Sequence, residues 1–309
     1  MSEFILILIS TFAFFSILGI ASFSGLFSER VGIVNIAIEA MMIVGAVFYG
    51  FLAQSFNISS PWMQIPITFI AAIITGFFAL LHGFVTIKLK GDHIISGVAL
   101  NLVAPAIAFF MLKIFGEGNK FISPVAELAV STDSSTNLTN IISFKVFILI
   151  IIFIITLIIL NKTKWGLRLK SIGENPQAAD VAGVNVNFYK WQGVFISGFL
   201  AGIAGSIFFQ LRGVAFTGTT NGLGFLALTV LIMGQWKSIY IILIAFIFSL
   251  IYATSSTISS GINSFESIKN YSDYFNILPY VFTIVLLAFT SKNSKAPAAV
   301  GLPYDKSKR

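Results

Sequence analysis

Residues 161–190 read NKTKWGLRLKSIGENPQAADVAGVNVNFYK, a polar stretch between two strongly apolar segments. Its acidic residues, Glu174 and Asp180, are outnumbered by lysines and arginines at positions 162, 164, 168, 170 and 190. In membrane proteins, loops rich in lysine and arginine stay on the cytoplasmic side. The stretch therefore predicts a cytoplasmic loop, and it fixes the orientation expected for the segments around it.

Within this loop, the residues that follow Glu174 predict a short helix. Asn175 is a favourable N-cap, Pro176 suits the first helical position, and Gly183 can end the helix. The residues between them favour helix, but a helix of about two turns is only marginally stable alone in water. We therefore expect it to rest on another protein; the alternative is an ordinary solvated connector.

The composition of the chain is that of a membrane protein. Of its 309 residues, 57% are hydrophobic and 10% are charged, and the mean hydropathy is +0.93. Soluble domains carry roughly 25% charged residues. The apolar segments are long enough to cross a bilayer as helices, and runs such as residues 148–160 lack the alternation of a barrel strand. The predicted fold class is an all-α polytopic membrane protein with a single transmembrane domain over residues 1–309.

Several functions are disfavoured by what the sequence lacks. There is no cysteine, and no GxxxxGK[ST] sequence that would cradle a nucleotide phosphate. No paired-carboxylate, Ser–His–Asp or Cys–His arrangement supports catalysis, and His82 and His93 have no partners at metal-ligand spacing. The net charge of +7 comes from basic residues at segment boundaries and in the tail, which disfavours nucleic-acid binding. We expect neither an enzyme nor a cofactor in this chain.

Nine transmembrane spans are predicted, with eight or ten as alternatives. The start MSEFILIL lacks the positive charge and cleavage site of a signal peptide, so the first segment is expected to remain as a span. The segment at residues 223–236 is short for a full crossing, and its flanking glycines suggest broken structure. The nine predicted spans are residues 4–27, 31–56, 65–87, 94–115, 144–160, 191–211, 223–236, 239–254 and 275–290.

The distribution of positive charge supports an odd number of spans. With residues 161–190 inside, nine spans place most of the 19 basic residues on the cytoplasmic side, including those of the tail at residues 291–309. The acidic stretch at residues 116–143 then falls outside, and so does the N-terminus. An even number of spans would break this agreement at one end.

Glu39 is the most unusual residue inside a predicted span. Counted from the start of residues 31–56, it lies about 13 Å deep, where a carboxylate costs at least ~2.5 kcal/mol. On a continuous helix it shares one face with Asn35 and Met42. Two interpretations stay open for Glu39: a lining or gate of a substrate path, and a hydrogen-bonding anchor between helices.

Other candidate path residues lie in two later spans. Gly97, Asn101 and Pro105 share a face of residues 94–115, where the proline is expected to kink the helix or free a carbonyl. Phe225 and Thr229 share a face of residues 223–236. The alternative for these residues is simple helix packing. A face of small residues, expected to let helices approach closely, is formed by Gly198, Ala201, Gly202 and Gly205.

Several stretches resemble one permease family. Residues 32–46, GIVNIAIEAMMIVGA, resemble the pattern GxxNIxxEGMMxxGA of the nucleoside branch of the bacterial ABC permeases, with Ala40 in place of glycine. Residues 95–102, ISGVALNL, resemble its VSGxALNLL stretch. Residues 173–184, GENPQAADVAGV, resemble its GENPxAAxxAGI loop.

The resemblance continues toward the end of the chain. Residues 222–228, GLGFLAL, and 234–236, GQW, resemble GRGFIALA and FGxW, although Leu223 replaces the arginine and Ser238 stands where proline is common. Residues 278–283, LPYVFT, and 301–305, GLPYD, resemble LPYVLT and GKPYD. The matches keep their order, so the chain resembles the shorter of the two permeases that pair in nucleoside importers. The larger family also holds ribose-type sugar and branched-chain amino-acid permeases.

The resemblance implies a type II ABC importer permease in the bacterial cytoplasmic (inner) membrane. It implies a second permease subunit in a heterodimer, a cytoplasmic ABC ATPase that binds ATP and Mg, and an extracytoplasmic substrate-binding lipoprotein. It also implies that the short helix is a coupling helix that docks on the ATPase through Glu174, Asn175, Pro176, Gln177, Ala178, Ala179 and Gly183.

The expected function is half of a translocation path for nucleosides. The alternatives are a simple-sugar permease for ribose-like or galactose-like substrates, an ion-driven secondary transporter, and a membrane scaffold without flux. The sparse intramembrane charge disfavours the ion-driven transporter. The residues expected to line the path are Asn35, Glu39, Met42, Gly97, Asn101, Phe225 and Thr229.

Overall fold

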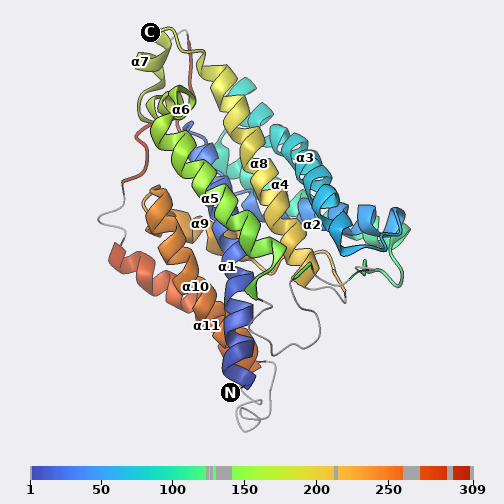
Figure 1. The fold of residues 1–309 in the computed structure, drawn as a ribbon. Coiled ribbons are helices and arrows are strands. Elements are labelled where there is room, and N and C mark those ends of the chain that lie inside the picture. The colour runs from blue at the N-terminus through green and yellow to red at the C-terminus, as the bar shows by residue number, and fades with distance from the viewer. Residues whose placement is uncertain are drawn as a thin grey trace.

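The computed structural model describes residues 2–122, 125, 128–129, 141–211, 215–259, 272–290 and 295–306. Over these residues the regular elements are all helices, which confirms the predicted all-α class (Figure 1). Much of the predicted external stretch at 116–143, and tail residues 291–294 and 307–309, lie outside the described residues.

The helices follow one another closely along the chain. Their bounds are α1 Ser2–Glu29, α2 Ile38–Ser55, the 3₁₀ turn η1 Pro61–Met63, α3 Gln64–Gly83, the π-helical turn η2 Phe84–Lys88, α4 His93–Phe115, α5 Phe144–Lys162, α6 Lys164–Glu174, α7 Pro176–Val181, α8 Val186–Leu211, α9 Leu223–Met233, α10 Ser238–Ser259 and α11 Ser272–Thr290.

Seven of the described helical segments are long and apolar enough to cross a membrane: α1, α2, α3 with its flanking turns, α4, α5, α8 and α10. Two shorter apolar helices, α9 and the Ile277–Ala288 part of α11, match the remaining two predicted spans. The 11 residues of α9 rise about 16 Å, roughly half of the hydrocarbon core. The predicted interruption at residues 223–236 is therefore confirmed.

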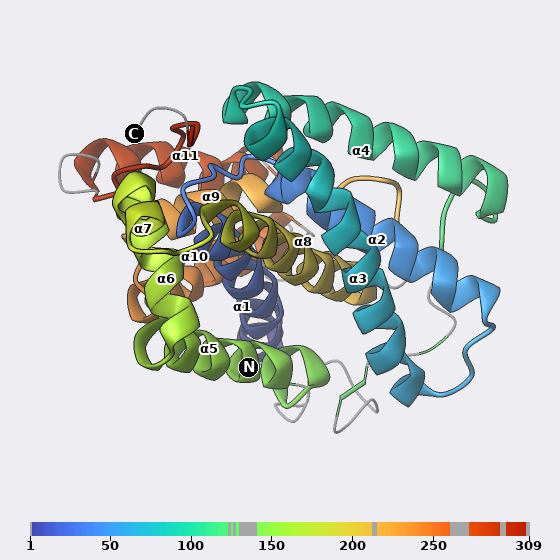
Figure 2. The same ribbon diagram turned by 90° about the horizontal axis from the view of Figure 1, so that it is seen from above.

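Helix α8 lies at the centre of the bundle, packed against α1, α2 and α3 (Figure 2). Its small residues make this contact possible. A Cβ atom added at Gly205 would lie 2.0 Å from the carbonyl oxygen of Met42, and one at Gly202 would lie 2.8 Å from the Cα atom of Ala72. The small-residue face predicted for this span is thus a packing face, as expected for close helix pairs.

The outer helices carry the apolar surface that a bilayer would cover. Phe110 on α4 is exposed, as are Ile158 on α5 and Leu243 on α10. Figure 2 shows α4 and α5 on opposite edges of the bundle, with α8 between them. A soluble protein of this size rarely exposes so much apolar surface, so this belt agrees with a lipid-facing perimeter.

The ends of the chain lie far apart. The N-terminal end of α1 is at one end of the molecule, whereas α6, α7 and the last described residues gather at the other end (Figure 1). An odd number of crossings requires this arrangement. The side of the membrane that each end faces stays a prediction.

One of the predicted span boundaries is wrong. Residues 31–37 are not helical, so α2 begins only at Ile38, where the sequence had suggested a helix from residue 31. Gly32 has a φ of +80°, a left-handed conformation that ends α1 and suits glycine. The polar loop predicted at 161–190 contains more helix than the one short helix expected, because α6 and the first turn of α8 lie within it as well as α7.

Candidate functional site

Two helices begin inside the protein and meet at their N-termini. Helix α2 follows the irregular residues 31–37, and α9 follows the irregular residues 215–222. A Cβ atom added at Gly224, near the start of α9, would lie 2.4 Å from the backbone nitrogen of Glu39 in α2. The first turn of a helix has N–H groups without intrahelical partners, so each of these starts needs acceptors from elsewhere.

Glu39 supplies the acceptors for the start of α9. Its Oε1 accepts hydrogen bonds from Thr220 Oγ1 at 2.6 Å and from the backbone N–H of Gly222 at 2.9 Å. Its Oε2 accepts one from the N–H of Gly224 at 2.7 Å. Because Glu39 also lies in the first turn of α2, its carboxylate sits at the positive ends of two helix dipoles.

Asn101 of α4 forms hydrogen bonds with backbone groups at the start of α2. Its Oδ1 accepts a hydrogen bond from the N–H of Ala40 at 2.9 Å, and its Nδ2 donates to the carbonyl of Ile36 at 3.0 Å. Gly97, one turn earlier, allows this approach, because a Cβ atom there would lie 3.1 Å from that of Ile36. Helix α4 therefore holds the entry to α2 in place.

A cavity of about 560 Å³ opens beside these contacts. Its size falls in the range of small-molecule sites, and its wall is mostly apolar with a few polar groups. Three residues predicted for the path, Glu39, Asn101 and Phe225, line it. The complete lining is Glu39, Ile43, Val98, Asn101, Leu102, Pro105, Thr219, Asn221, Gly222 and Phe225.

The other predicted path residues are buried in packing contacts and do not line this cavity. Asn35 lies in the irregular segment before α2, so the prediction that it shares a helical face with Glu39 is wrong; its Nδ2 donates to Ser197 Oγ at 2.7 Å. Thr229 Oγ1 donates to the carbonyl of its own helix at Phe225. Met42 packs against α8, and Gly97 against residues 36–37.

The sequence did not point to three residues that shape the irregular segment leading into α9, called here the α9 entry. They are Thr220, Asn221 and Tyr280. Asn221 and Gly222 have φ values of +53° and +77°, and the carbonyl of Asn221 accepts a hydrogen bond from the hydroxyl of Tyr280 in α11. The Asn-Gly pair is a turn signal that could have marked this bend. Nothing in the sequence pattern pairs Tyr280 with it.

Both histidines hold the irregular segment before α2. His82 hydrogen-bonds to Ser96 Oγ through Nδ1 and to the carbonyl of Val34 through Nε2, each at 2.9 Å. His93 Nδ1 accepts a hydrogen bond from the N–H of Val34 at 3.3 Å. These contacts give the histidines a structural role at residues 31–37.

The short helix of the predicted coupling loop forms as α7. Asn175 Oδ1 accepts a hydrogen bond from the N–H of Ala178 at 2.9 Å, Pro176 occupies the first helical position, and Gly183 has a φ of +82°. These features confirm the predicted N-cap and C-terminal glycine. The helix is short because glycine in the left-handed conformation ends it after Val181.

The predicted docking residues divide between two faces of α7. Pro176 and Ala179 are buried against the rest of this chain, so they are not available to a partner. Gln177 and Ala178 are exposed, and so is their neighbour Val181, which was not among the predicted docking residues and is 76% exposed. Glu174, Asn175 and Gly183 are exposed at the two ends of the helix.

The C-terminal tail connects α6 and α7 to the irregular segment before α2. The N–H of Ala299 donates to the carbonyl of Gly173 at 2.8 Å, and that of Ala298 to Glu174 Oε2 at 3.3 Å. Two residues further on, the N–H of Gly301 donates to the carbonyl of Gly32 at 3.1 Å. The tail is thus a bridge from the α6–α7 region to residues 31–37, and through them to Glu39.

Comparison with known proteins gives a family match over most of the chain. The model of a family described as "Branched-chain amino acid transport system / permease component" matches residues 7–287. No solved structure matches the chain.

Two curated relatives match almost from end to end. The nucleoside ABC transporter permease protein NupC of Lactococcus lactis is 36% identical, over 93% of this chain and 92% of its own length. The guanosine ABC transporter permease protein NupQ of Bacillus subtilis is 34% identical, over 94% of this chain and 93% of its own. A more distant relative, the nucleoside ABC transporter permease protein NupB of Lactococcus lactis, is 24% identical over 72% of this chain and 65% of its own length.

Proposed function

Because the chain belongs to the branched-chain amino acid transport system permease family, we propose that it is the transmembrane permease subunit of an ABC importer for nucleosides. Proteins of this family are permease components of ABC transporters and are not themselves enzymes. The observation that carries the substrate class is the near full-length similarity to NupC and NupQ.

The cavity beside Glu39 has the chemistry to accept a nucleoside. Phe225 offers a partly exposed aromatic face on which a base can stack. Asn101, Thr219 and Asn221 line the same cavity with amide and hydroxyl groups that suit ribose hydroxyls. An apolar wall with a few polar groups holds such a ligand without binding it too tightly for release.

Movement at α7 has a physical route to this cavity. An ATPase that pulls on the exposed face of α7 also displaces the tail, because Ala298 and Ala299 are bonded to Glu174 and Gly173. The tail in turn holds Gly32, at the start of the irregular segment that leads into α2. A shift there changes the contact between Glu39 and the start of α9, and alternating access follows from opening and closing this contact.

The proposed partners are those of an ABC importer. An ABC ATPase, which binds the ATP and Mg, docks on Gln177, Ala178 and Val181. A substrate-binding lipoprotein delivers the nucleoside at the opposite end of the molecule. A second, different permease completes the path, as the separate similarity of this chain to NupC and NupB in one organism supports.

The direct test is uptake by the assembled complex in proteoliposomes. We expect labelled guanosine or uridine to accumulate only when the binding protein, the ATPase and ATP are all present, and unlabelled ribose not to compete. Equal competition by ribose would point to a simple-sugar permease. Uptake by this chain alone, driven by an ion gradient and indifferent to ATP, would identify a secondary transporter.

A further inference from the structure

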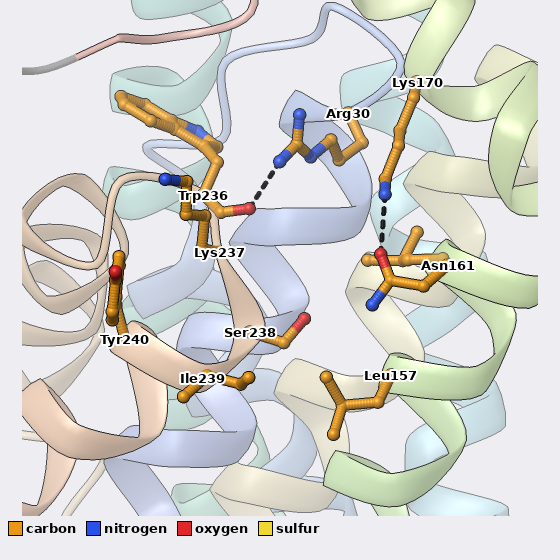
Figure 3. Close-up of a pocket in the computed structure, with 10 residues that line it drawn as sticks. Arg30, Leu157, Asn161, Lys170, Trp236, Lys237, Ser238, Ile239 and Tyr240 are labelled. Atoms are coloured by element: carbon orange, nitrogen blue, oxygen red, sulfur yellow. Dashed lines mark hydrogen bonds between the residues drawn. The ribbon is translucent and has the colours of Figure 1, made fainter.

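A second cavity, of about 290 Å³, lies at the α6–α7 end of the molecule and is separate from the Glu39 cavity. It is bounded by the end of α1, the end of α5, α6 and the turn between α9 and α10. In Figure 3, Arg30 and Lys170 lie on one side of this space, and Ser238, Ile239 and Leu157 lie on the other. None of the proposed transport steps uses it.

The residues that line this cavity carry an excess of positive charge. Arg30, Lys170 and Lys237 line it, and none of its described lining residues is acidic. The nearby Glu29 accepts a hydrogen bond from Trp236 Nε1, and Glu174 accepts one from the tail. Burial lowers the pKa of Arg30, and the charge of Glu174 partly opposes this shift, so Glu174 balances part of the charge of Arg30. The charges of Arg30 and Lys170 act on each other, and the exposed Lys237 adds a third basic residue at the edge of the cavity, so an anion in this space would be stabilised.

The hydrogen bonds of these cations leave capacity for a ligand. Arg30 Nη2 donates to the carbonyl of Trp236, but its buried Nε has no hydrogen-bond partner. Lys170 Nζ donates to Asn161 Oδ1 at 2.8 Å, which uses one of its three protons (Figure 3). Burial, and then the charge of Arg30, lower the pKa of Lys170.

The start of α10 adds to the positive potential. Its first residues, Ser238, Ile239 and Tyr240, line the cavity and precede the bond from the N–H of Ile241 to the carbonyl of Lys237. Their N–H groups have no intrahelical acceptor, as at any helix N-terminus. Side-chain cations and a helix N-terminus therefore converge on one space, an arrangement that favours a phosphate group.

The remaining wall of the cavity is hydrocarbon. Leu157, Leu160 and Ile239 line it, and Ile158 and Leu243 extend the apolar surface along α5 and α10, where both are exposed. Lys237 lies with its Nζ 5.3 Å from the ring centroid of Tyr240, a pair of residue types typical of the membrane interface. A ligand that combines a phosphate with long aliphatic chains would contact both the basic side and the hydrocarbon side of the cavity.

We propose that this cavity binds the phosphodiester headgroup of an anionic phospholipid from the leaflet on the α6–α7 side. The phosphate lies beside Arg30 and Lys170, the exposed Lys237 reaches it from the edge of the cavity, and the acyl chains follow the outer faces of α5 and α10. The lipid then joins α6 to the ends of three transmembrane helices.

The test is lipid retention by the complete transporter, purified with its partner subunits and analysed by native mass spectrometry. Phosphatidylglycerol and phosphatidylcholine are the two probes, added in equal amount. We expect selective retention of phosphatidylglycerol, and about tenfold or greater loss of it in the double variant Lys170→Gln/Lys237→Gln. The matched control is Lys164→Gln, an exposed residue of α6 outside the cavity, which retains the lipid.

Three outcomes would overturn the proposal. These are equal retention of the two lipids, unchanged retention in the double variant, and complete displacement of the lipid by millimolar inorganic phosphate, which would assign the site to a soluble phosphate. The single variant Lys237→Gln guards against misfolding, because Lys237 is exposed and its replacement leaves the bond between Lys170 and Asn161 intact. We expect it alone to weaken retention several-fold.

Discussion

The carboxylate of Glu39 in α2 accepts a hydrogen bond from the backbone N–H of Gly224 in α9 at 2.7 Å, and so joins two helices that both begin inside the protein. The contact connects segments 185 residues apart in the sequence. It also borders the cavity proposed for the substrate. Changes at either residue therefore act on stability and on transport together.

Replacing the carboxylate of Glu39 by an amide is expected to stop transport while the protein still folds. Glu39→Gln keeps one acceptor oxygen but turns an NH₂ group toward an N–H or hydroxyl donor of the α9 entry. Uptake by the reconstituted complex should fall at least tenfold, and the melting temperature should drop only modestly. A Glu39→Gln transporter with normal uptake would show that the link between α2 and α9 does not gate the path.

A methyl group at position 224 is expected to force the two helix starts apart. The added Cβ of Gly224→Ala would lie 2.4 Å from a backbone nitrogen, which the structure relieves only by shifting α2 or α9. Overpacking of this kind costs about 1–3 kcal/mol, so thermal unfolding should occur at lower temperature. As a control, Gly118→Asn places a side chain where nothing lies within 4 Å, at a φ of +61° that asparagine tolerates better than most residues, and it should lower the melting temperature much less.

Substitutions of Phe225 can distinguish a nucleoside permease from a sugar permease. If its ring stacks on a base, Phe225→Ala should raise the KM for guanosine about tenfold or more, whereas Phe225→Tyr should stay near the wild-type value. Kinetic measurements on the complete complex would decide this. An equal, small effect of both variants would mean that the ring only packs against the cavity wall.

Substitutions on the two faces of α7 are expected to cause different defects, one in ATPase binding and one in the stability of the permease. Val181→Arg places a charge on an exposed position, so the permease should keep its melting temperature but lose the ATPase during co-purification. Ala179→Arg places the same charge at a position that is 5% exposed, so the permease itself should unfold more easily. If Val181→Arg left ATPase binding intact, docking on this face of α7 would be wrong.

Removal of the tail tests the route from α7 to the cavity. Truncation before Ala298 deletes the bonds to Gly173, Glu174 and Gly32. We expect the ATPase to bind and hydrolyse ATP, but uptake to be lost. The control is Lys90→Ala, which removes the ion pair with Asp305 but keeps the tail; a single ion pair near the surface contributes little, so uptake should persist.

Local chemistry made parts of this structure predictable. The N-cap at Asn175 and the glycine at the end of α7 act within one turn, so sequence alone identified them. The glycines of α8 were likewise recognised as a packing face. Glu39 was singled out because a carboxylate is costly in a bilayer, and its hydrogen bonds now explain how that cost is offset.

Long-range contacts explain what the sequence did not reveal. Residues 31–37 are apolar enough to be mistaken for helix, and their irregular path depends on His82, His93 and the tail, none of which is near in sequence. The same holds for Tyr280, which meets the α9 entry from α11. Periodicity carries no information about partners this distant.

The cap on α9 also constrains how the protein is made. Helix α9 has 11 residues, fewer than the roughly 20 that a bilayer-spanning helix needs, so it cannot enter the bilayer stably as an independent segment during synthesis. Its first turn is completed by a carboxylate translated 185 residues earlier. We therefore expect α9 to reach its final position only after α2 has folded and Glu39 is in place to cap it.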